Sequence, residues 1–438
     1  MPKRQGERSA RRAKSPLLLA VKLLIVVALS CVPACWGKLE LEERSFITLL
    51  GVDSIANGNL LITAVVAVPR AMGGGGRMAG GGGVGTGALM LSAQGKDVSQ
   101  ALDNMELLSS RHLTTVHMAF VVLGEGFAGT DVGPIIDIFS RSLEFRHNTL
   151  VAVCRGRAID FLQDYQSIEE SEPSQYLLKL VTTSYEVGGT CPLVTMHEFM
   201  VGYNTVSVEP WAPYVEIASA APAERPAVQP PQQAAGAAAG GQAAGAETVE
   251  PTRVIKIVGA ALFKKVGDVQ KMVGYLDTEE SQAALLMQGT FHSGRLTLLY
   301  PGDQTEATLV IHHVSSRPHA KVVGEALNVK FEIRIEASLH ESVVGRVEVP
   351  EKNPEFHQRL VFAGQDRMVA VLRRTFDKLT VLGSDVIGFG RLAEPSFASY
   401  GEWEAFDWPS RFKDTTAVFD VKMHVLTVGY TATKPFPR

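Results

Sequence analysis

The stretch Phe331-Glu-Ile-Arg-Ile-Glu-Ala-Ser-Leu-His340 alternates apolar and polar residues without a break. Successive side chains of a β-strand point to opposite faces, so this pattern predicts a strand with one apolar face. The run 354–382 follows, and its apolar residues recur at helical spacing. They are Phe356, Leu360, Val361, Met368, Val371, Leu372, Phe376, Leu379 and Leu382. Gly383 suits the end of this helix. A long helix across antiparallel strands predicts an α+β domain.

Further elements can be read on both sides of this pair. We expect strands at 308–314 and 419–425 in the C-terminal half. In the N-terminal half, strands and helices alternate, with strands expected at 59–68, 116–123 and 149–154 and helices at 96–110, 132–141 and 158–163. The chain is therefore predicted to be α+β, with two to three domains in which mixed or antiparallel sheets are packed by helices.

Two low-complexity segments interrupt these elements. Residues 72–87 are dominated by glycine and predict a loop, and residues 218–250 are rich in Ala, Gly, Pro and Gln. The second segment has almost nothing to bury, so we expect a disordered linker or insertion. The predicted order is a signal peptide over 1–34, one or more domains over 35–217, the linker over 218–250, and a C-terminal domain over 251–438.

The N-terminus has the pattern of an export signal. A basic flank precedes an apolar core over 17–29, and small residues follow before Cys35. A cysteine at this point predicts attachment of a diacylglyceride to its thiol and cleavage before it, which makes Cys35 the candidate lipidation site. Val32 and Pro33 depart from the usual lipobox. An ordinary signal peptidase would also accept Val32 and Ala34, and a third reading is an uncleaved anchor, which Lys22 and the short core disfavour.

Charge is unevenly distributed along the chain. The formal net charge is −4, but the first 34 residues carry seven Lys or Arg and one Glu, which leaves about −10 on the remainder. A mildly acidic body argues against a nucleic-acid partner. After residue 35 no apolar run is long enough to span a bilayer, so we expect attachment to a membrane only through the N-terminus.

No sequence motif indicates catalysis or a bound metal. His197-Glu198 resembles the start of a zinc-protease helix, but Val201 stands where the second histidine is needed. His312, His313 and His319 are more simply explained as surface histidines. We find no nucleophile elbow, phosphate loop, dinucleotide fingerprint or calcium loop, and we expect neither a cofactor nor an enzyme.

Three groups of residues have a structural and a functional reading. Cys154 and Cys191 remain after the signal, and we expect buried thiols rather than a disulfide. Gly388-Phe389-Gly390 is expected to form a tight turn after the long helix. Trp403, Phe406 and Trp408 are candidates for a partner-binding patch or for the core.

Several segments, taken in order, resemble the Ger(x)C family of spore germination lipoproteins. The similarity begins at Cys35-Trp36-Gly-Lys-Leu-Glu-Leu41 and continues through Phe46-Ile-Thr-Leu-Leu-Gly-Val-Asp53. Further similar segments are Ser92 to Leu102, His117 to Val153, Gly259 to Lys265, Met272 to Leu276, Gln288-Gly289 and Asp385 to Gly390, with Trp403 beyond. The low-complexity segments 72–87 and 218–250 are longer than the family pattern.

The resemblance implies a non-enzymatic, palmitate-bearing subunit of a nutrient germinant receptor, needed for nutrient-triggered germination. It would be lipid-anchored on the outer face of the inner spore membrane and would dock with A-type and multi-pass B-type subunits. The regions 35–217 and 251–438 would then be the N- and C-terminal germination-protein domains. Cys35 carries the anchor, and the indole of Trp36 suits the headgroup region. Direct nutrient binding is left open.

Two other classes compete with this interpretation. A lipid-anchored solute-binding protein of a transporter would have two α/β lobes around a cleft, which the α+β pattern after residue 290 disfavours. A secreted hydrolase would need acidic residues that are distant in sequence but gather in one cleft.

Overall fold

The computed structural model describes residues 20–25, 40–67, 88–164, 172–220, 252–300, 305–324, 326–342 and 354–426. The chain divides into two units, residues 1–44 and residues 45–438. In the first unit the structure describes a short helix over 20–25 and a 3-10 turn, Leu41–Glu43. None of the helices described is long and apolar enough to cross a membrane.

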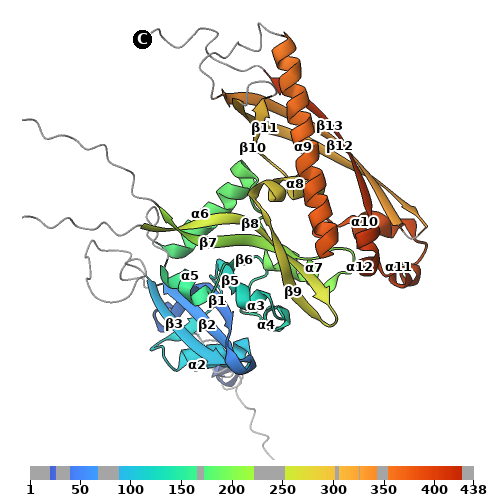
Figure 1. Ribbon diagram of the computed structural model, residues 1–438. Helices are drawn as coiled ribbons and strands as arrows, with labels where there is room; N and C mark the ends of the chain where they lie inside the picture. Colours follow the sequence, from blue (N-terminus) through green and yellow to red (C-terminus); the bar gives the residue numbers. More distant parts are fainter. Residues whose placement is uncertain are drawn as a thin grey trace, which may run out of the picture. The chain divides into compact units, whose positions relative to one another are not determined.

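A nine-stranded mixed sheet is the first layer of the second unit (Figure 1). Its strand order is β3-β2-β1-β5-β6-β7-β8-β9, and β4 pairs with β1. The strands are β1 (Arg44–Ser54), β2 (Leu60–Ala67), β3 (Ala88–Gly95), β4 (His112–Thr114), β5 (Phe120–Gly124), β6 (Leu150–Cys154), β7 (Trp211–Ala220), β8 (Thr252–Val266) and β9 (Val269–Asp277). The four central strands β1, β5, β6 and β7 are parallel, and the flanking pairs are antiparallel.

Helices cover both faces of this sheet. Side chains of α2 (Val98–Glu106), α4 (Gly133–Arg141) and α7 (Met196–Asn204) share one apolar core with the sheet. Those of α5 (Ala158–Asp164) and α6 (Pro173–Thr183) form a second core on the other face. The short α3 (Glu125–Ala128) follows β5, and a π-helical turn, Ser184–Gly188, follows α6. Because both faces are covered, β5 and β6 are buried at every position, as expected of central parallel strands.

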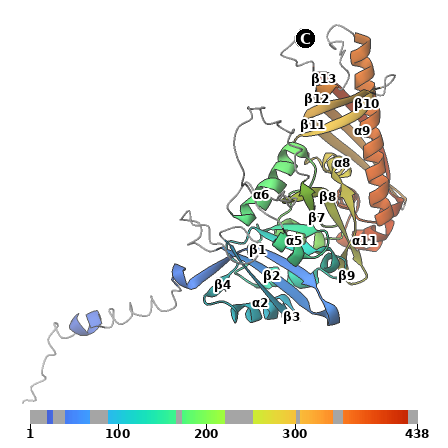
Figure 2. The ribbon, with the colours of Figure 1, turned by 60° about the vertical axis from the view of Figure 1, so that its left-hand side comes forward.

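The second sheet has four strands in the order β10-β11-β12-β13. They are β10 (Gly294–Tyr300), β11 (Thr305–Val323), β12 (Ala326–Ser342) and β13 (Thr416–Leu426). The first three are antiparallel, and β13 lies parallel to β12. The helix α9 (Pro354–Leu382) lies across this sheet (Figure 2). The predicted α+β class with one long helix over a sheet is confirmed.

Helix α9 has the bounds that the sequence predicts. Leu360, Leu372 and Leu379 are fully buried against the sheet. Gly383 follows with a φ of +68°, a left-handed conformation that a glycine adopts without strain. The Ser384 N–H donates to the Leu379 carbonyl oxygen at 3.1 Å, which closes the last turn. Five short helical elements connect α9 to β13: α10 (Phe389–Ala393), a 3-10 turn (Glu394–Ser396), α11 (Tyr400–Phe406), α12 (Trp408–Arg411) and a second 3-10 turn (Phe412–Asp414).

The first sheet contains strands from both sides of the low-complexity segment 218–250. Ala220 at the end of β7 pairs with Thr252 at the start of β8, and residues 218–220 belong to β7. The strands β8 and β9 therefore complete a sheet that residues before 218 begin. The segment 72–87 and residues 221–250 lie outside the described residues, as do residues 1–19 and 26–39. The predicted domain boundaries stay predictions.

Replacing Phe331 by alanine tests the core between the second sheet and α9. Phe331 is fully buried, and its ring centroid lies 5.5 Å from that of Phe419 and 5.8 Å from that of Phe389. We expect Phe331→Ala to lower the free energy of unfolding by about 3–5 kcal/mol in urea denaturation. Val381→Ala removes a side chain of α9 that is 86% exposed, and should change it by less than about 0.5 kcal/mol. Equal losses in the two variants would contradict this packing.

Candidate functional site

Cys35 and Trp36, the residues to which the sequence assigns function, lie outside the described residues. The described chain resumes at Glu40, and β1 begins at Arg44. Within the described residues, the most extensive polar cluster joins the two sheets, and we take this junction as the candidate functional site.

The acidic half of the junction is the start of α8 (Thr278–Gln288), directly after β9. Asp277 is the N-cap: its Oδ1 accepts from the Glu280 N–H at 2.8 Å, and Glu280 Oε2 accepts from the Asp277 N–H at 3.0 Å. This reciprocal capping box satisfies two donors of the helix start. Glu279 lies between them, so three carboxylates gather where the helix dipole stabilises negative charge.

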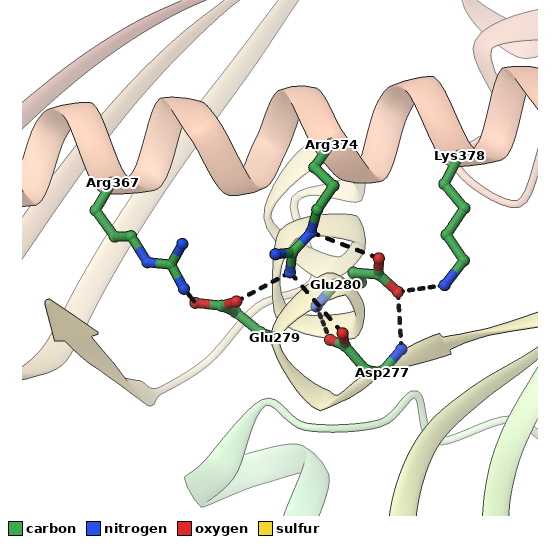
Figure 3. A network of polar contacts seen from close by, with 6 residues as sticks. All are labelled: Asp277, Glu279, Glu280, Arg367, Arg374 and Lys378. Carbon is green, nitrogen blue, oxygen red and sulfur yellow. Dashed lines mark hydrogen bonds and ion pairs between the residues drawn. The ribbon is translucent and has the colours of Figure 1, made fainter.

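The basic half of the junction is one face of α9. Arg367, Arg374 and Lys378 are seven and four residues apart, which places them on the same side of the helix. Arg367 and Arg374 both pair with Glu279, the latter at 2.9 Å between Nη2 and Oε2. Lys378 Nζ lies 2.6 Å from Glu280 Oε2. Figure 3 shows the three cations pointing from α9 toward the three acids.

Arg374 is the central residue of the junction. Its guanidinium contacts Glu279, Glu280 at 3.5 Å and Asp277 at 3.8 Å. The Glu280 side chain is only 6% exposed, so its charge depends on Arg374 and Lys378. Because each cation is paired with an acid, this site is a structural joint between β9 and α9, and its groups are not arranged for proton transfer.

A second joint holds the chain that leaves α9. Asp385 is buried, and its Oδ1 accepts from the N–H groups of Gly388 and Phe389, both at 2.9 Å. Its Oδ2 accepts from the Gly390 N–H at 2.9 Å and from Trp408 Nε1 at 3.0 Å. Burial raises the pKa of Asp385 to about 6, and these four donors oppose the rise. Gly388-Phe389-Gly390 forms the predicted turn after the long helix, with φ of +84° at Gly388.

The aromatic residues beyond this turn belong to the core. Trp403 and Trp408 are buried, with ring centroids 6.1 Å apart, and Phe406 packs against Trp403 at 6.0 Å while remaining partly exposed. Of the two readings of these residues, the core is the one that the structure supports. Trp408 also supplies one of the four donors to Asp385, so its indole N–H is satisfied.

Polar groups also gather at the carboxyl ends of the central strands, where ligands bind in many α/β folds. Asp53 accepts from the Ala158 and Ile159 N–H groups at 2.7 and 2.9 Å and so caps α5. Burial raises the pKa of Asp53, and these two hydrogen bonds oppose it. A hollow of about 280 Å³ lies beside α5, but Arg155 pairs there with Glu216, and Arg253 pairs with Asp164. Two of the cations at this edge are thus paired with carboxylates of the fold.

The histidines and cysteines are placed as expected. His312 and His313 are exposed, and His312 Nε2 lies 2.7 Å from Ser338 Oγ. His197 lies on α7 with Val201 one turn later. Cys154 and Cys191 are buried free thiols, and burial raises the pKa of both, that of Cys191 to about 12. In the part of the chain that the structure describes, no three His, Cys, Asp or Glu side chains are placed to hold a metal ion.

Two family models match successive parts of this chain. The spore germination protein N-terminal domain matches residues 37–217, and the spore germination B3/GerAC-like C-terminal domain matches residues 258–429. The chain therefore belongs to the Ger(x)C family of spore germination proteins, which is not a known enzyme family. This assignment favours the germination class over the solute-binding and hydrolase classes.

Three proteins of Bacillus subtilis (strain 168) are similar to this chain. The putative spore germination protein YfkR is 23% identical and covers 73% of each chain. Spore germination protein KC is 22% identical over 91% of this chain and 90% of its own length, and spore germination protein YndF is 20% identical over 98% and 100%. The crystal structure of the GerBC protein matches with a TM-score of 0.50 at 14% identity, over 86% of this chain and 96% of that one, and it supports the fold.

Neutralising Arg374 tests the junction. Arg374→Met leaves three carboxylates at the start of α8 with fewer cations, so we expect the free energy of unfolding to fall by about 1–2 kcal/mol, with a smaller loss at high salt. Arg373→Met is the matched control, because Arg373 is exposed on the same helix and has no carboxylate partner among the described residues. Urea denaturation at low and high ionic strength measures both. A loss no greater than that of the control would contradict the joint.

The buried Asp385 predicts a pH dependence of stability. Its pKa is about 6 in the fold against an ordinary 3.8, so the folded state binds this proton more tightly than the unfolded state does. The stability linked to it is fully present below about pH 4 and is lost as the pH rises through about 6. We therefore expect the unfolding free energy of the wild type, relative to Asp385→Asn, to fall across this range in urea titrations. Asp377→Asn, at an exposed position of α9, is measured alongside as the matched control. A difference between wild type and Asp385→Asn that does not change with pH would contradict the raised pKa of Asp385.

Proposed function

We propose that this protein is a lipid-anchored, extracytoplasmic subunit of a spore germinant receptor. It would lie on the outer face of the inner spore membrane, dock with A-type and multi-pass B-type subunits, and be needed for nutrient-triggered germination. The observation that carries this proposal is the position of Cys35. The N-terminal germination domain is matched from residue 37 onward, immediately after Cys35-Trp36 and the apolar export signal.

The proposed anchoring chemistry needs only one residue of the mature protein. The Cys35 sulfur would displace glycerol phosphate from a phosphatidylglycerol lipid, losing the thiol proton and forming a thioether to the diacylglyceryl group. Hydrolysis of the peptide bond between Ala34 and Cys35 would then make Cys35 the first residue. A single acyl chain gives marginal membrane binding, whereas two chains give a stable anchor. Trp36 would then lie at headgroup depth, where indole rings are favoured.

The structure supports a docking role through its rigidity. Polar joints at Arg374 and Asp385 fix α9 to the first sheet and to the chain that follows. An apolar core continues from the first sheet to the second. A partner that binds one sheet would therefore meet a body whose other sheet is held in place.

Radiolabelled palmitate tests the anchor. We expect label in the wild-type protein and none in Cys35→Ser, because the thiol is the only group that the lipid transferase would modify. Cys154→Ser is the matched control and should keep the label, since Cys154 is buried. Equal labelling of wild type and Cys35→Ser would overturn the anchor.

Deletion of the gene tests the role. Spores that lack the protein should germinate more slowly with at least one nutrient, and a plasmid copy should restore the rate. Germination with a non-nutrient trigger serves as the control. An unchanged response across a broad nutrient panel would count against a receptor subunit.

A further inference from the structure

Three leucines at one end of the first sheet are exposed to solvent. Leu107 and Leu108 follow α2 and are 83% and 62% exposed, and Leu143 follows α4 and is fully exposed. A single exposed leucine is ordinary on a protein surface. Three at the ends of two helices that contact each other are apolar side chains that the fold itself does not bury, which is typical of an interaction site.

Chain topology places these helix ends at the same edge of the sheet. Helix α4 leads from the carboxyl end of β5 to the start of β6, so it ends at the amino edge of the parallel strands. Helix α2 begins after Gly95, which pairs with Leu60 next to the carboxyl end of β1. The helix then leads to β4, and β4 pairs with β1. It therefore ends at the amino edge too. The helices contact each other and share one core (Figure 1).

Both leucine turns are held firmly by the fold. The Leu108 N–H donates to the Met105 carbonyl oxygen at 2.9 Å, and Met105 is buried. Phe145, two residues after Leu143, is buried with its ring centroid 4.6 Å from that of Phe139. Each turn is thus anchored to the core by a buried neighbour of its exposed leucine.

An arginine accompanies each turn. Arg111 lies three residues after Leu108, and Arg146 lies three residues after Leu143. Both are exposed, and within the described part of the chain neither guanidinium has a carboxylate at ion-pair distance. Glu144 is also exposed beside Leu143, so over residues 107–111 and 143–146 the two arginines exceed the acidic charge by one. Exposed leucines with an excess of cationic charge fit the surface of an anionic bilayer, because leucines enter the interface and arginines meet phosphate groups.

The N-terminal chain arrives at this same edge. β1 starts there, nine residues after Cys35. Nine residues span at most about 30 Å when fully extended. A lipid on Cys35 would thus keep the amino edge of the first sheet within about 30 Å of the bilayer. This length of chain alone does not decide which side chains touch the bilayer.

We propose that Leu107, Leu108 and Leu143 enter the headgroup region of the membrane, with Arg111 and Arg146 on anionic lipid phosphates, and so orient the anchored protein. This inference rests on the proposed lipid anchor. It adds a second, non-covalent contact that fixes the amino edge of the first sheet toward the bilayer.

Lipid-quenching fluorescence tests the contact on the full, lipidated chain. The protein is reconstituted on vesicles of phosphatidylethanolamine and phosphatidylglycerol that contain a headgroup-level nitroxide lipid. Leu143→Cys carries an environment-sensitive thiol dye. Ala56→Cys is the control, because Ala56 is exposed just beyond the other end of β1. The native Cys154 and Cys191 are buried with raised pKa values and react slowly.

We expect a blue-shifted emission and strong quenching for the Leu143→Cys dye, and neither for the Ala56→Cys dye. Arg111→Glu with Arg146→Glu should reduce the quenching. Flotation of the vesicles reports the anchor separately: protein that fails to float refutes the proposed lipidation. Protein that floats with an unquenched Leu143→Cys dye overturns the membrane contact and leaves the anchor standing. Protection of that dye only after a multi-pass partner is added would assign the surface to a protein and also overturn it.

Discussion

The contact between the acidic start of α8 and the basic face of α9 joins the two sheets of this protein. Asp277 is the last residue of β9, and Glu279 and Glu280 lie in the first turn of α8. Arg367, Arg374 and Lys378 belong to the helix that covers the other sheet. Because the Glu280 side chain is nearly buried, separating the two elements would leave its charge without a partner. The placement of α9, and with it the second sheet, therefore depends on this joint.

The sequence predicts which helices and strands form better than it predicts which of them pair or pack together. The 29 residues of α9 are predicted in full, because their apolar residues keep one helical face and Gly383 ends it. β11 is longer than the predicted 308–314, because its second half lacks an apolar alternation and is formed by pairing with β12. Pro318 is tolerated there because β10 ends its pairing at Ile311, which leaves this part of β11 as an edge.

The joints could be read from the sequence only in part. Asp277-Thr-Glu-Glu280 is a capping box that local pattern could have found, and the spacing of Arg367, Arg374 and Lys378 marks one helix face. Nothing in either motif says that they meet, since 87 residues separate Glu280 from Arg367. In the same way, the segment 218–250 hides that β7 and β8 are neighbours. Contacts between distant segments need the tertiary structure.

A body of two sheets with fixed joints, behind the lipid anchor proposed for Cys35, is suited to binding partner proteins. We propose that this body belongs to a membrane complex. The most direct measurement is co-purification from spore inner membranes in mild detergent. We expect the multi-pass B-type subunit to be retained with the wild-type protein, and the Cys35→Ser protein to leave the membrane fraction without it. Recovery of the wild-type protein from the aqueous fraction without either partner subunit would contradict its membership of a membrane complex.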